Sequence, residues 1–294
     1  NQVVAFKVVH PDIYYQFIFP IMFIKFYKYL VKNIYCLNCY DTVFTFDDFF
    51  NNLSNQSNMQ LELNNMKYFY DCYKENDHIL IPKPLHATKN ILIMEFIDGE
   101  KFDSTTMYVF EKQKIVLLLT LFIKDNYYFK DYYHSDLHES NWKVIKFEDF
   151  YKIIIYDYGY ISTNKFKEHF KKLTYYNDIL DVNSIIGLAY DNCKDIKMNK
   201  KKFIFKFEEY MIERKIIFNE PFCDDIICAL YNFIFINNIN IESYMFELFI
   251  SMILFKKNIM KFLSLKKIGV SNYNTIISSY IGSIHICDKY NIFT

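Results

Sequence analysis

The first third of the chain carries short apolar runs separated by polar turns, a pattern typical of small β-sheets. Residues 2–9 are rich in β-branched side chains and end at His10-Pro11, which predicts a strand with Lys7 inside it, followed by a turn. Residues 79–82 and 91–96 are two further apolar runs of strand length. We expect these two runs to be adjacent strands of one sheet.

Longer segments have apolar residues at the spacing of an α-helix. Residues 59–75 and 105–126 are predicted as helices on this ground. Residues 12–32 have similar spacing, but Pro20 lies inside them, so we expect a kinked or broken helix. Residues 51–58 are polar and suit a loop or the entry to a helix.

Strand and loop signals return between residues 134 and 160. A polar loop is followed by Val144-Ile145, predicted as a short strand, and by the apolar strand 152–156. Residues 163–294 are predicted to form amphipathic helices with Asn- and Lys-rich connections, and Met245–Phe255 among them is expected to be a core helix.

This order of elements predicts an α+β fold with two lobes in one domain. The small β-rich lobe is placed at residues 1–97 and the larger helical lobe at 98–294, with the polar clusters where the pattern changes. A junction between lobes is a common place for a ligand site.

Composition narrows the classes of partner. The chain has 294 residues, of which 52% are hydrophobic, and this is enough for a large core. Its formal net charge is zero, so no basic surface favours nucleic acid. No apolar run is long enough to predict a transmembrane helix. Seven Cys without a repeating pattern favour a reducing intracellular compartment, and the lone Cys36-x-x-Cys39 pair lacks the second ligand pair of a zinc site.

Candidate chemistry centres on the segment from His134 to Asn141. Asp136 lies on the predicted loop, Asn141 follows five residues later, and Asp157 comes 16 residues after Asn141 at the end of an apolar strand. Phosphoryl transfer needs an Asp that accepts a proton from the attacking hydroxyl and oxygen ligands that hold Mg²⁺ on the phosphates of ATP. Protein kinases have the same interval from Asp to Asn and a following Asp-x-Gly. The pattern therefore predicts a site for Mg²⁺ and ATP, with a structural polar loop as the alternative.

Two further regions fit this interpretation. Lys7 lies in Val-Ala-Phe-Lys and would neutralise the phosphates, while Glu62 on the predicted helix would hold Lys7 in place. The alternative for Glu62 is a solvated helix residue. Backbone groups of Glu95, Phe96 and Ile97 would pair with adenine, unless this stretch is only an ordinary strand and turn.

Several segments together resemble the UbiB/ADCK family of atypical protein kinase-like proteins, which is associated with coenzyme Q biosynthesis. The segments carrying the resemblance are Val3–Pro11, Glu62-Leu-Asn-Asn65 with Phe69, Ile79–Pro82, Ile91–Gly99 and His134–Asn141. They occur in the order found in the family, and His138 is a feature that ordinary protein kinases lack. Small-molecule kinases of the aminoglycoside or choline type share the Asp and Asn spacing, but not His138 or the run from Val3 to Pro11.

The resemblance implies a role for each matching residue. Lys7 and Glu62 would form the ion pair, Asp136 would be the catalytic Asp, and Asn141 and Asp157 would be the metal ligands. His134 and His138 would shape the loop.

The chain also departs from the family pattern. Glu139-Ser140 stands where the family has Pro-Gly, so a conformation that requires Gly would be hindered, and Tyr158 replaces the middle Phe. The family's Lys-x-Gly-Gln extension and Ala-rich loop do not occur, so we expect the chain to be an N-terminally truncated part of a longer reading frame.

The retained residues favour an atypical kinase or ATPase that uses Mg-ATP. A nucleotide-binding pseudokinase-like module without turnover is the alternative, which Ser140 favours. The phosphoryl acceptor is open between a protein, a lipid and a small molecule. Peripheral membrane contact is compatible with the aromatic content, and a compositional bias of an A+T-rich coding sequence explains that content as well.

Overall fold

The computed structural model describes residues 3–33, 55, 57–102, 107–147, 150–168, 182–194, 196–215, 224–237, 239–242 and some positions of 244–254. The chain divides into two compact units. Unit 1 consists of Asn1–Val8, Asn58–Glu168 and Ser251–Thr294, and unit 2 of Val9–Ser57 and His169–Ile250. All of the candidate site residues belong to unit 1. The lobe boundary between residues 97 and 98 stays a prediction.

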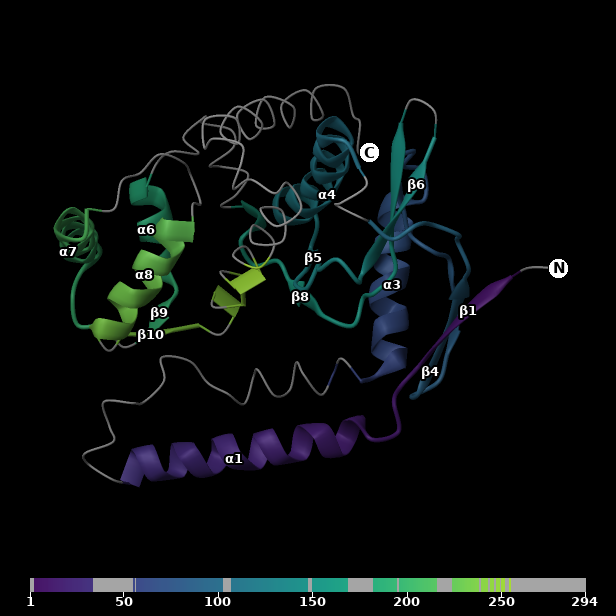
Figure 1. The fold of residues 1–294 in the computed structure, drawn as a ribbon. Coiled ribbons are helices and arrows are strands. Elements are labelled where there is room, and N and C mark those ends of the chain that lie inside the picture. The colour runs from purple at the N-terminus through teal and green to yellow at the C-terminus, as the bar shows by residue number, and fades with distance from the viewer. Residues whose placement is uncertain are drawn as a thin grey trace. The chain divides into compact units, whose positions relative to one another are not determined.

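A three-stranded antiparallel sheet in unit 1 carries Lys7. Its order is β1 (Val4–Val8), β4 (Ile91–Glu95) and β3 (Pro84–Ala87), and β1 lies beside β4 in Figure 1. Lys7 on β1 is paired with Leu92 on β4. Leu92 is fully buried, so the pairing places the backbone of Lys7 beside a well-packed position of the sheet. The predicted strands at residues 2–9 and 91–96 are confirmed.

The expected pairing of residues 79–82 with 91–96 was wrong. The partner of β4 is β3, whereas β2 (Ile79–Leu80) pairs in parallel with β7 (Tyr151–Ile155), which also pairs with β6 (Trp142–Lys146). Thr88 explains the local hairpin, because its hydroxyl accepts from the amides of Asn90 and Ile91 in the turn. Burial of Ile79 beside Ile153 explains the distant pairing of β2.

The helix α3 (Met59–Tyr73) confirms the helix predicted over 59–75. Asn58 caps its start, since the side-chain oxygen accepts from the amides of Gln60 and Leu61. Its buried face has helical spacing and consists of Met59, Glu62, Leu63, Met66, Phe69 and Tyr73. Glu62 is the charged member of this face, and a buried charge needs a partner.

The rest of unit 1 carries the polar loop. The predicted helix over 105–126 is observed as α4 (Val109–Phe129), and it is followed by β5 (Tyr132–His134), which pairs with β8 (Ile161–Thr163). The chain after β4 passes close over β6 and β7, because a Cβ at Gly99 would lie 2.6 Å from Cδ1 of Ile154. This close approach accounts for glycine at that position.

Unit 2 contains most of the remaining helices. The helix α1 (Ile13–Asn33) contains Pro20 and continues through it (Figure 1). Of the two expected forms, a kinked or a broken helix, the broken one was wrong. Proline removes one backbone hydrogen bond and its ring crowds the preceding turn, a cost that this helix bears without a break. Later elements are α6 (Val182–Asp191), β9 (Cys193–Lys194), α7 (Lys200–Glu213), α8 (Asp224–Ile236) and β10 (Asn240–Ile241).

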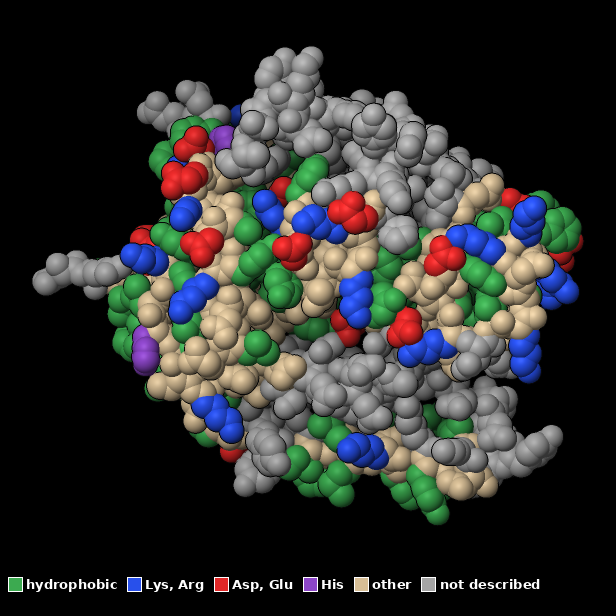
Figure 2. All heavy atoms as spheres, turned by 180° about the vertical axis from the view of Figure 1, so that it is seen from behind, with side chains coloured by type: hydrophobic (Ala, Val, Ile, Leu, Met, Phe, Trp, Pro, Cys, Tyr) green, Lys and Arg blue, Asp and Glu red, His purple; other side chains and the backbone are tan. Residues whose placement is uncertain are grey.

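Charges on the visible surface are mixed. Basic and acidic side chains are interspersed on the face seen in Figure 2. No helix in the described part of the chain is long and apolar enough to cross a membrane.

The described residues reach only some of the remaining predicted segments. Cys36 and Cys39 and most of the polar stretch 51–58 lie outside the described residues. Within Met245–Phe255, Met245, Leu248 and Ser251 are buried, whereas Ile250 and Leu254 are exposed.

Candidate active site

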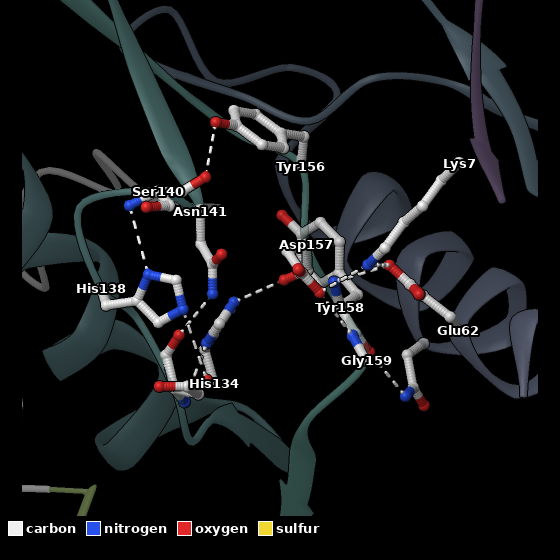
Figure 3. Close-up of polar contacts among 12 residues, drawn as sticks. Lys7, Glu62, His134, His138, Ser140, Asn141, Tyr156, Asp157, Tyr158 and Gly159 are labelled. Carbon is white, nitrogen blue, oxygen red and sulfur yellow. Dashed lines mark hydrogen bonds and ion pairs between the residues drawn. The ribbon is translucent and has the colours of Figure 1, made fainter. Parts of the chain in front are cut away.

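Lys7 connects two acidic side chains that are distant in the sequence. Its ammonium nitrogen lies 2.7 Å from Oε1 of Glu62 on α3 and 2.9 Å from Oδ1 of Asp157, which follows β7 (Figure 3). Glu62 is only 1% exposed, whereas Lys7 and Asp157 are each about one-third exposed. The cluster therefore has one buried carboxylate and two groups that solvent or a ligand can reach.

Burial and ion pairing shift the three pKa values in different directions. Burial favours the neutral form of Lys7, but the carboxylates of Glu62 and Asp157 outweigh it and raise the pKa of Lys7. Burial also dominates at Glu62 and raises its pKa despite the contact with Lys7. At Asp157 burial also acts to raise the pKa, but the charge of Lys7 and the hydrogen bond from the amide of Gly159 outweigh it, so the pKa of this carboxyl is lowered.

His134 ties the polar loop to the segment that holds Asp157. Its Nδ1 accepts from the amide of Asp136, so the proton of the neutral ring is on Nε2 and is donated to the backbone carbonyl of Asp157 over 2.7 Å. Burial lowers the pKa of His134, which favours this neutral form. Both ring nitrogens are thus occupied within the protein, and the geometry fits the expected role in shaping the loop.

Asp136 and Asn141 are held close together at the start and end of the loop. The side-chain nitrogen of Asn141 donates to the carbonyl of Asp136 over 2.7 Å, which leaves its side-chain oxygen for another partner. His138 has its Nε2 at 3.6 Å from Oδ2 of Asp136, while its Nδ1 accepts from the amide of Ser140. Asp136 itself is about two-fifths exposed, so a ligand can reach its carboxylate.

The donor set suits Mg²⁺. Asp157 offers a carboxylate and Asn141 an amide oxygen, and Mg²⁺ is commonly held by one or two such oxygens together with water and phosphate. One carboxylate oxygen of Asp157 is used by Lys7 and Gly159, so the other is left for a cation. The described residues contain no group of three His, Cys, Asp or Glu side chains that would make a metal cage. The two side chains therefore suit a cation such as Mg²⁺ that takes most of its ligands from water and phosphate.

The residues proposed to meet adenine lie at the end of β4. The amide of Glu95 donates to the carbonyl of Lys83, and the amide of Phe96 to that of Val3. No hydrogen bond or ion pair joins residues 95–97 to Lys7, Glu62 or Asp157 within the described parts of the chain. These residues extend the sheet that carries Lys7 and are separate from the polar cluster.

Ser140 raises no conformational objection to the site. Among the described residues other than glycine, only Lys215 has a positive φ, at 54°. Ser140 therefore has a backbone conformation open to any residue. The hydroxyl of Tyr156 donates to its carbonyl over 2.6 Å, a contact that sequence reasoning did not predict.

Asn65 makes a second contact that was not predicted, since the sequence motifs included this residue without giving it a role. Its side-chain nitrogen donates to the carbonyl of Tyr158 over 3.0 Å, and the amide of Tyr158 donates to Oε1 of Glu62 over 3.2 Å. The three-residue spacing from Glu62, which places both on one side of α3, was the available signal.

The fold and this site define a protein kinase-like α+β domain. The family model described as the ABC1 atypical kinase-like domain matches residues 1–186, and the chain belongs to this family. The family predicted from the sequence motifs is thereby confirmed.

Solved structures support the fold. Eleven chains match, among them Rv3197 from Mycobacterium tuberculosis in its complex with erythromycin, with a TM-score of 0.52 and 12% sequence identity. That match covers 79% of this chain and 67% of Rv3197. The expected α+β kinase-like fold is confirmed at this level. A comparison with curated proteins found no match.

Proposed function

We propose that the protein binds Mg-ATP and either transfers the γ-phosphoryl group to an acceptor or hydrolyses ATP. The observation that carries the proposal is Lys7 held between Glu62 and Asp157, at 2.7 and 2.9 Å. A cation fixed in this way beside a metal-binding carboxylate is the arrangement that phosphoryl transfer requires. Membership of an atypical kinase-like family supports it.

Each residue has a chemical task in the proposed reaction. Asn141 and Asp157 would hold Mg²⁺, which when bound neutralises part of the phosphate charge. Lys7 would contact the phosphates, with Glu62 keeping its ammonium group in place. Asp136 would accept the proton of the attacking hydroxyl or water, as that oxygen bonds to the γ-phosphorus and the bond to the β–γ bridging oxygen breaks. Glu95, Phe96 and Ile97 would meet the adenine through backbone groups other than the amides of Glu95 and Phe96, which donate within the sheet.

A nucleotide-binding module without turnover is the second candidate. Ser140, adjacent to Asn141, is the observation in its favour, because a side chain stands where the family pattern has Gly and could hinder a close approach to the loop backbone, although its backbone conformation is open to any residue. Both candidates require the same nucleotide site. They differ only in whether Asp136 acts on a substrate.

Thermal unfolding with Mg-ATP and Mg-ADP tests the nucleotide site. Ligand that binds only the folded state raises the midpoint, so we expect an increase of several degrees in the wild type. Asp157→Asn keeps the size of the side chain but loses the charge that holds the cation, and we expect no increase. Equal shifts in the two proteins would overturn the assignment of Asp157, and no shift in either would overturn the nucleotide site.

A further inference from the structure

The two peptide groups on either side of Tyr158 are each held by a side chain from one face of α3. The amide of Tyr158 donates to Oε1 of Glu62 over 3.2 Å, and its carbonyl accepts from the side-chain nitrogen of Asn65 over 3.0 Å. Glu62 and Asn65 are one helical turn apart, so a single rigid element makes both contacts. The assignment of the Asn65 amide is unambiguous, because only its nitrogen can donate to a carbonyl.

These two hydrogen bonds lie next in the chain to Asp157, the carboxylate that would bind the metal in the proposed function. Asp157 precedes Tyr158 in the chain, and the Tyr158 ring is fully buried with its centroid 5.1 Å from that of Phe69 on the same helix. The ring contact holds Tyr158 in place but leaves the orientation of the two adjoining peptide groups open. The Tyr158 amide lies in the Asp157–Tyr158 peptide, whose carbonyl also accepts from His134. The Tyr158 carbonyl lies in the Tyr158–Gly159 peptide, whose N–H donates to Oδ1 of Asp157 over 3.1 Å, so the Asn65 bond orients the group that contacts the Asp157 carboxylate.

We propose that Asn65 is a positioning residue that fixes Asp157 for cation binding through the carbonyl of Tyr158. This inference rests on the proposed Mg-ATP site. Glu62 cannot do this alone, because it contacts the preceding peptide group through the Tyr158 amide, and its Oε1 also accepts from Lys7. The Asn65 contact does not involve Lys7, so it needs no change if Lys7 turns toward a phosphate.

Asn64 supplies a matched control. It is exposed on the same helix, one residue from Asn65, which is half-buried. Asn→Ala raises intrinsic helix propensity equally at the two positions, so a difference between the variants reports the contact and not the helix. Asn65→Asp and Asn64→Asp form a second pair in which the donor is replaced by an acceptor of the same size.

Hydrogen exchange without nucleotide is the first measurement. In Asn65→Ala we expect the amides of Tyr158 and Gly159 to exchange several-fold faster than in the wild type, with the β5 and β8 amides unchanged. Asn64→Ala is expected to match the wild type. If Asn65→Ala exchanges like Asn64→Ala at these amides, the positioning role is overturned, whatever the nucleotide experiments show.

Cation affinity is the second measurement, made by titrating Mg²⁺ at fixed ADP. Loss of one part-buried hydrogen bond predicts an affinity about fivefold weaker in Asn65→Ala, and a larger loss in Asn65→Asp. If the wild type binds Mg²⁺ and the Asn65 variants have the same Mg²⁺ affinity as the matching Asn64 variants, the role of Asn65 is overturned while the proposed function stands. A wild type that does not bind would overturn the proposed function as well.

Discussion

The ammonium nitrogen of Lys7 lies 2.7 Å from Oε1 of Glu62, a residue 55 positions further along the chain. The carboxylate is almost inaccessible to water, so its charge depends on this partner. Its other oxygen, Oε2, is buried without a hydrogen bond among the described residues, and this increases the dependence.

Removal of Lys7 should therefore destabilise the protein. Lys7→Met leaves the buried Glu62 without its cation, and we expect a loss of about 2 kcal/mol in the free energy of unfolding at neutral pH, measured in urea. Lys67→Met is the control, since Lys67 is exposed on α3. Adding Glu62→Gln to Lys7→Met should recover part of the loss. Equal stability of the two Lys variants would contradict the dependence of Glu62 on Lys7.

Asp136→Asn should separate binding from turnover. The side chain is not assigned to the metal, so the midpoint shift with Mg-ADP should equal that of the wild type. Phosphate release from ATP should fall by about 100-fold or more, since a positioned general base contributes that much. Glu139→Gln, an exposed change in the same loop, should leave the rate unaltered. Undiminished release in Asp136→Asn would remove Asp136 from the mechanism, and absence of release in the wild type would favour the module without turnover.

Tyr156→Phe should loosen the turn beside Asn141. The variant loses the bond from the hydroxyl to the carbonyl of Ser140, and the apparent affinity for Mg²⁺ at fixed ADP should weaken about threefold. Because glycine makes the turn more mobile, Tyr156→Phe should weaken the Mg²⁺ affinity by a larger factor in a Ser140→Gly background. An identical effect in both backgrounds would show that Tyr156 does not stabilise this turn.

Glu111 should make stability sensitive to acid. It accepts from Lys146, from the hydroxyl of Tyr151 and from the amide of Tyr108, and these bonds lower its pKa to about 2. A carboxyl with a lowered pKa in the folded state stabilises above its unfolded pKa of about 4.3, and the contribution disappears as pH falls toward the folded value. Between pH 5 and about pH 3, wild-type stability in urea should fall more steeply than that of Glu111→Gln. Parallel curves would show that Glu111 is not linked to folding.

Much of the site could be predicted because its chemistry lies in short segments. Asp136 and Asn141 are separated by one loop, and Asp157 comes at the end of a strand that the apolar run 152–156 made evident. The helix with Glu62 and the strand with Lys7 were also predicted from local periodicity. Their direct contact was an expectation from kinase chemistry, which the geometry of Lys7 and Glu62 fits.

Other relationships needed the folded chain. The pairing of β2 with β7 was missed, since a hairpin within residues 84–95 satisfies β4 locally and frees Ile79 for a distant strand. The sequence left open whether the helix at residues 12–32 kinks or breaks at Pro20, because the effect of proline on the neighbouring backbone allows either, and α1 does not break.

Local sequence thus specified the strand with Lys7, the helix with Glu62, and the spacing of Asp136, Asn141 and Asp157, because backbone preferences and side-chain periodicity act over a few residues. Tertiary packing alone decided that Asn65 meets the carbonyl of Tyr158, 93 positions away. Such a contact depends on how whole elements bury their apolar faces, since the burial of Met66 and Phe69 sets the position of α3 and so of its polar residues.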